Sequence, residues 1–169
     1  WPVAIDGLAW LDASAARQAS GLSQARGALS LRLRCLPPWQ FSPLTMRPLR
    51  LYLGGAPQIN AALFDLLYAP AIGPPRPQPV GLENAEHLLA SEPGVESSGL
   101  ALSARMHCPQ ALMYFDLPIP QIQHGDTMTL CIPFRRAPET AMHLKTDDVH
   151  LDFIPVVIRF TRNSETHPV

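Results

Sequence analysis

The segment Leu29-Ser30-Leu31-Arg32-Leu33-Arg34-Cys35 alternates apolar and polar residues without interruption. Successive side chains of a β-strand point to opposite faces, so a period of two predicts a strand with one buried face and one solvent face. Pro37 and Pro38 follow it, and proline ends a strand because it cannot donate a hydrogen bond to a neighbouring strand. We therefore predict a strand whose leucines point into the core and whose arginines form a basic outer face.

Other segments follow the same design. Leu49, Leu51 and Leu53 alternate with polar or larger residues, and a similar pattern recurs near the end of the chain. Each leucine set is expected to point inward, as are Met128, Leu130 and Ile132. Strands are predicted over residues 1–11, 29–35, 49–53, 112–117, 127–134 and 149–153, and the apolar run 155–158 continues the last of them.

The clearest helix is predicted over residues 57–68. Pro57 stands where the first helical turn tolerates proline, and apolar residues follow at helical spacing. Two further short helices are expected near 84–90 and 99–107, whereas the small and polar residues of 12–27 are predicted to form a loop with at most a short helical turn.

These elements predict an α+β fold that is mainly β, with mixed or antiparallel sheets and about three short helices. Strands and helices do not alternate regularly, which argues against a doubly wound parallel sheet. A proline-rich connector at 69–79 suggests a boundary. We expect a β-rich part over residues 1–72 and a second α+β part over residues 73–169, and the pattern leaves open whether the two share one core.

Charge is scarce along the chain. Charged residues make up 16% of the 169 residues, against about 25% in an average soluble domain. The 13 Lys and Arg nearly balance the 14 Asp and Glu, which excludes a general nucleic-acid binder. No apolar run is long enough for a membrane span. Low charge favours a protein that buries part of its surface against other proteins, although a lightly charged monomer fits the same composition.

The residues that could carry chemistry do not form a recognisable motif. No two of the six histidines are four residues apart, and the chain contains no phosphate-binding glycine loop or nucleophile elbow. Cys35, Cys108 and Cys131 lack metal-ligand spacing and are expected to be reduced, buried thiols of a cytosolic protein. We therefore predict no catalytic, cofactor-binding or metal-binding residue, and no enzyme activity.

Two charged pairs have alternative interpretations. Asp147-Asp148 could serve acid–base chemistry, but adjacent carboxylates before a strand are more typical of a solvated turn. Arg135 and Arg136 follow the strand that ends at Phe134. They could anchor a partner, since arginine is enriched in protein interfaces, or they could only keep the strand end soluble.

Five segments together resemble the TssF family, also called VasA or ImpG, of the bacterial type VI secretion baseplate. Trp1-Pro2-Val3 also fits the strand with which that family opens this region, so the resemblance spans nearly the whole chain. It implies that the chain is an internal fragment of a longer family member. The five segments, in the order of the family, are Leu49–Gly55, Ala61–Leu67, Pro79–Glu83, Cys108–Leu117 and Phe153–Phe160.

The chain departs from the family pattern in two places. Ala104-Arg105-Met106 stands where members usually carry an acidic–aromatic–aromatic run before a proline, and Ile158-Arg159 replaces an Asn-Leu pair in the closing motif. The resemblance makes Arg105, Ile158 and Arg159 candidate partner contacts, beside Arg135 and Arg136.

The resemblance implies a structural role in a contractile, phage-tail-like injection machine. The expected partners are TssG-type, TssK-type and TssE-type baseplate proteins and further copies within the wedge, in the cytoplasm at the baseplate docked on the inner membrane. Two other classes remain as alternatives: a free-standing β-rich module that binds a ligand or peptide, and an enzyme whose site is assembled from distant residues.

Overall fold

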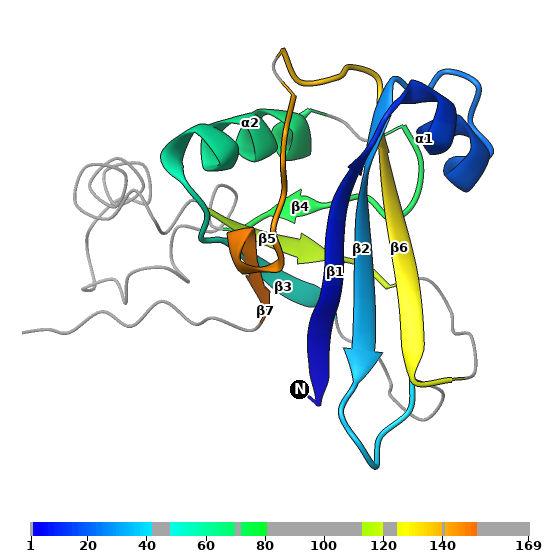
Figure 1. The fold of residues 1–169 in the computed structure, drawn as a ribbon, viewed down its shortest axis with the longest axis vertical. Helices are drawn as coiled ribbons and strands as arrows, with labels where there is room; N and C mark the ends of the chain where they lie inside the picture. Colours follow the sequence, from blue (N-terminus) through cyan, green and yellow to red (C-terminus); the bar gives the residue numbers. More distant parts are fainter. Residues whose placement is uncertain are drawn as a thin grey trace, which may run out of the picture.

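The computed structural model describes residues 2–41, 48–69, 72–80, 113–119, 125–139 and 141–151. Within these ranges the chain forms seven strands in two antiparallel sheets, two α-helices and one short 3-10 helix (Figure 1). The α+β class predicted from the sequence is therefore confirmed. The predicted helices near 84–90 and 99–107 lie outside the described residues.

The first sheet has the strand order β1-β2-β6, with β2 in the centre. Leu31 of β2 lies opposite Leu8 of β1 and Leu130 of β6. Leu29, Leu31 and Leu33 are all at most 1% exposed, which confirms the buried face read from the alternation. The strands of this sheet are β1 (Val3–Leu11), β2 (Gly27–Cys35) and β6 (Thr127–Phe134).

The second sheet has the order β4-β5-β3-β7 and is antiparallel throughout. Leu49, Leu51 and Leu53 of β3 are buried, as the alternation predicts. Arg50 points to the opposite face, where its guanidinium forms a two-bond ion pair with Asp116, with nitrogen–oxygen distances of 2.9 and 3.0 Å. The strands are β3 (Leu49–Leu53), β4 (Gln78–Pro79), β5 (Tyr114–Leu117) and β7 (Val149–Leu151).

Helix α2 (Pro57–Tyr68) has the bounds predicted from the sequence. Proline occupies its first turn, where a missing N–H leaves no hydrogen bond unmade. Its buried side chains are Leu63, Leu66 and Leu67. Phe64 and Tyr68 each meet the Phe115 ring of β5 edge to face, at centroid distances of 6.1 and 5.7 Å, so the helix is fixed against the second sheet.

Helix α1 (Ala13–Ser20) is longer than the short helical turn that the predicted loop over 12–27 allowed, so the loop prediction is wrong for these residues. The Asp12 side chain accepts hydrogen bonds from the backbone N–H groups of Ser14 and Ala15, at 2.8 and 2.9 Å. Gly21 ends the helix in the left-handed conformation, with φ 69°, which glycine adopts without steric cost. The buried face is a single alanine, Ala16, packed near Ala25 and Ala28, so no large apolar residues marked the helix in the sequence.

The Asp12→Ala substitution is expected to destabilise the chain by about 1 kcal/mol, because two N–H groups at the start of α1 lose their acceptor. Urea denaturation followed by circular dichroism measures the change. Asp12→Asn is the matched control and should cost less, since an amide oxygen also caps a helix. Equal losses in the two variants would contradict the cap.

One cluster of buried side chains joins the two sheets and α2. Leu31 of β2, Leu51 of β3 and Leu130 of β6 all belong to it, so strands from both sides of residue 72 contribute. Short helix η3 (Thr146–Asp148) leads directly into β7. None of the described helices is long and apolar enough to cross a membrane.

Candidate interaction surface

The loop that follows β6 carries Arg135 and Arg136, the two predicted contact residues that the structure describes. Both are exposed, and the predicted position after the strand is confirmed. The other three, Arg105, Ile158 and Arg159, lie outside the described residues. The structure therefore gives a local geometry for two of the five predicted contact residues.

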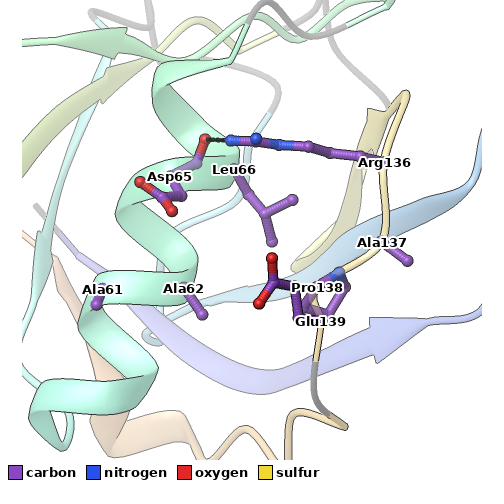
Figure 2. Close-up of a pocket in the computed structure, with 8 residues that line it drawn as sticks. All are labelled: Ala61, Ala62, Asp65, Leu66, Arg136, Ala137, Pro138 and Glu139. Carbon is purple, nitrogen blue, oxygen red and sulfur yellow. Dashed lines mark hydrogen bonds between the residues drawn. The ribbon is translucent and has the colours of Figure 1, made fainter.

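Arg136 reaches from this loop to helix α2 (Figure 2). Its guanidinium donates a hydrogen bond to the backbone carbonyl of Asp65, with a nitrogen–oxygen distance of 2.6 Å. Asp65 lies in the last turn of α2, and its carbonyl also accepts the backbone N–H of Ala69 at 3.3 Å. A positive charge is stabilising at this end of a helix. Arg136 thus links the loop to the helix within the chain.

Between α2 and residues 136–139 lies a hollow of about 320 Å³. Ala62, Leu66 and Pro138 contribute apolar surface to it, while Asp65 and Glu139 bring carboxylates. Figure 2 shows the Glu139 carboxylate directed into the space between helix and loop, and the Asp65 carboxylate directed away from Arg136. The hollow combines an apolar lining with charged groups at its margin, as protein interfaces do.

Arg135 differs from its neighbour. Within the described part of the chain its side chain forms no hydrogen bond or ion pair, and it is exposed. All N–H donors of the Arg135 guanidinium are therefore accessible to a partner, whereas Arg136 already uses one N–H donor in its bond to α2. The two arginines therefore differ: Arg136 links the loop to α2, and the Arg135 side chain is accessible to a partner.

A second exposed feature was not predicted. Leu36 and Trp39, in the turn after β2, are 44% and 52% exposed. Tryptophan is enriched among the residues that dominate the binding energy of protein interfaces, whereas leucine is not. Trp10, by contrast, is partly buried and stacks on Phe134 at a centroid distance of 5.9 Å.

The cysteines that the structure describes are free thiols. Burial raises the pKa of Cys35, with the nearby Asp126 carboxylate adding to the effect, and burial also raises the pKa of Cys131. Both thiols therefore stay protonated at neutral pH, opposite to the state that a cysteine nucleophile needs. Cys35 is buried as predicted, Cys131 is only partly buried, and Cys108 lies outside the described residues.

The interpretation of Asp147-Asp148 as a solvated turn is wrong for Asp148. Asp147 is exposed, but Asp148 is 9% exposed and accepts a hydrogen bond from the backbone N–H of Lys145 at 2.7 Å. This hydrogen bond joins the residue before η3 to the last residue of η3, so the carboxylate stabilises this short helix. In the described ranges no group of three or more His, Cys, Asp or Glu residues is placed to hold a metal ion.

Comparison of the chain with known proteins found a matching family model and a solved structure with a similar fold. The family model described as "Type VI secretion system, TssF" matches residues 1–169. A chain in the cryo-electron microscopy structure of a type VI secretion system TssK-TssF-TssG baseplate subcomplex superposes with a TM-score of 0.66 at 14% sequence identity. The match covers 89% of this chain and 30% of that one, so the present chain spans about a third of its length. None of the curated proteins compared with the chain matches it. Because the family model covers the sequence from end to end, the chain belongs to the TssF family of type VI secretion proteins.

Proposed function

We propose that this chain is a structural part of the baseplate wedge of a type VI secretion system and acts through protein–protein contacts rather than catalysis. The observation that carries the proposal is the family match over all 169 residues. The fold shared with a chain of a TssK-TssF-TssG assembly supports it. No feature in the described residues favours the alternative of a free-standing binding module.

The proposed partners are TssG-type and TssK-type baseplate proteins first, with a TssE-type protein and further copies of the wedge as additional contacts. The proposed location is the cytoplasmic baseplate docked at the inner membrane. The low charge content supports a chain that covers much of its surface in an assembly.

We propose that residues 1–72 and 73–169 act as one rigid unit in that assembly. Each sheet contains strands from both parts, and the two parts share a cluster of buried side chains. A single core lets a load applied at one sheet pass to the other through close-packed side chains.

Arg135 is the proposed partner contact within the described loop, and Arg105, Ile158 and Arg159 extend the proposal to the rest of the chain. The support for Arg135 is its exposure in the loop whose next residues, 136–139, line a partly apolar hollow of about 320 Å³. Arginine in such a position is favoured in interfaces because its planar guanidinium binds carboxylates and stacks on aromatic rings.

A co-purification experiment tests the proposal. The TssF-family protein that carries this sequence, co-expressed with the TssG-type and TssK-type proteins of the same genome, should elute as one complex in size-exclusion chromatography with light scattering. Arg135→Glu should weaken the complex about tenfold or more, the loss that follows from a buried, unpaired charge of the wrong sign.

Arg76→Glu is the matched control, because Arg76 is also exposed and lies in the connector before β4. It should leave the elution profile unchanged. A wild-type protein that elutes alone at all concentrations would contradict the proposed function, whereas equal binding by the Arg135 and Arg76 variants would contradict only the assigned contact.

A further inference from the structure

The outer face of the first sheet carries two arginines that share one carboxylate. The Arg32 Nε lies 3.1 Å from one Asp6 carboxylate oxygen, and the Arg34 Nε lies 3.5 Å from the other. Arg32 also donates from Nη2 to the backbone carbonyl of Asp6 at 3.2 Å. Asp6 is the extra residue of a β-bulge between Ile5 and Gly7, where the register of β1 on β2 shifts.

The bulge explains how one carboxylate reaches both arginines. An extra residue in one strand re-aims its side chain relative to the regular alternation. The Arg32 side chain lies against β1 beside the bulge, since a Cβ at Gly7 would meet the Arg32 Nε at an ordinary contact distance of 3.4 Å.

The two guanidinium groups remain largely unsatisfied. Each carries five N–H donors, and the described contacts use two on Arg32 and one on Arg34. Their side chains are 57% and 47% exposed. Asp126, which precedes β6, forms no ion pair with either. One carboxylate against two guanidiniums leaves a local excess of positive charge on this face.

The surface beside Arg32 is hollowed and lined by small residues. A depression of about 310 Å³ lies over the centre of the sheet, and its lining includes Gly7, Ala9, Ser30 and Thr129 together with Arg32. Small side chains let a partner approach the strands closely, and the hydroxyls of Ser30 and Thr129 offer further hydrogen bonds. α1 packs on β2 and β6 next to this hollow, because Cys131, which packs against the alanine cluster of α1, pairs with Ser30.

We propose that this outer face, defined by Asp6, Arg32, Arg34 and the adjoining hollow, docks an acidic segment of another baseplate protein. Arginine binds carboxylates through paired, charge-assisted hydrogen bonds, and the excess of guanidinium over carboxylate selects a negatively charged occupant. The net charge of −1 for the whole chain favours a short acidic peptide segment over a polyanion such as nucleic acid. This inference rests on the proposed function, because it draws its partner from the same assembly.

The test measures the affinity of the whole TssF-family protein for the purified TssG-type and TssK-type proteins at low and high NaCl. Replacing both arginines, Arg32→Gln with Arg34→Gln, should weaken binding to one of these proteins at least tenfold in low salt. The variant should also lose most of the salt dependence seen for the wild type, since screening acts on the removed charges. The matched control, Arg26→Gln with Arg76→Gln, removes two other exposed arginines and should bind within about twofold of the wild type, as rim charges away from a contact change affinity little.

Asp6→Asn separates docking from a structural role. It breaks the same ion pairs within the chain but keeps both positive charges, so it should bind at least as tightly as the wild type. Equal loss of affinity in Asp6→Asn and in the double arginine variant would overturn the proposal, because the ion pairs would then matter only for local structure. Unchanged binding by the double arginine variant would overturn it as well. A wild type that binds neither protein would overturn both this inference and the proposed function.

Discussion

Leu51→Ala is expected to lower the free energy of unfolding by about 2–5 kcal/mol. Leu51 is 1% exposed and lies in β3, between β5 and β7. Truncation removes apolar contacts and leaves a cavity that two packed sheets and α2 cannot easily fill. Urea denaturation of the 169-residue chain, followed by tryptophan fluorescence, measures the loss.

The matched control is Leu36→Ala, the same chemical change at a side chain that is 44% exposed. It should change stability by no more than about 0.5 kcal/mol. If Leu51→Ala cost less than about 1 kcal/mol, β3 would have its leucines on the wrong face and the core described above would be incorrect.

Gly27→Ala is expected to cost about 1–3 kcal/mol, because the added Cβ would overlap the Trp10 ring and force it to move. Trp10 is stacked on Phe134 of β6, with the two rings within 12° of parallel. Displacing the ring therefore disturbs β1 and β6 together. Thermal unfolding, with near-ultraviolet circular dichroism to report on the tryptophan, measures both effects.

Gly7→Ala is a suitable comparison, since a Cβ there meets its nearest neighbour at ordinary contact distance, 3.4 Å. It should cost less than Gly27→Ala. A Gly27→Ala variant with wild-type stability and an unchanged tryptophan signal would show that the ring moves aside freely, against the tight packing inferred here.

The strands were predictable because their signal is local. Leucine recurs at every second position from Leu29 to Leu33 of β2 and from Leu49 to Leu53 of β3, and burial follows the alternation there. Helix α2 was predictable for the same reason, with apolar residues at helical spacing. Helix α1 was not, because its contact with the sheet is made by Ala16, which is too small to stand out in a hydrophobic pattern.

The site was only partly predictable. The exposure of Arg135 and Arg136 follows from their place after a strand, but the bond from Arg136 to the Asp65 carbonyl joins positions 71 residues apart. Nothing in the local sequence encodes such a contact. The burial of Asp148 was missed for a related reason. Its carboxylate accepts a hydrogen bond from the Lys145 N–H, and whether a carboxylate has such a donor nearby depends on the backbone geometry.

The place of β2 in its sheet has a consequence during synthesis. One neighbour, β1, emerges before it, but the other, β6, begins at Thr127, 92 positions after Cys35. At about 5–20 residues per second, translation leaves an interval on the order of 5–20 s between the two. Throughout it, the nascent hairpin presents an open strand edge beside a row of leucines, the kind of surface that pairs with other chains. Ribosome-bound chains should therefore recruit chaperones until β6 emerges and closes that edge.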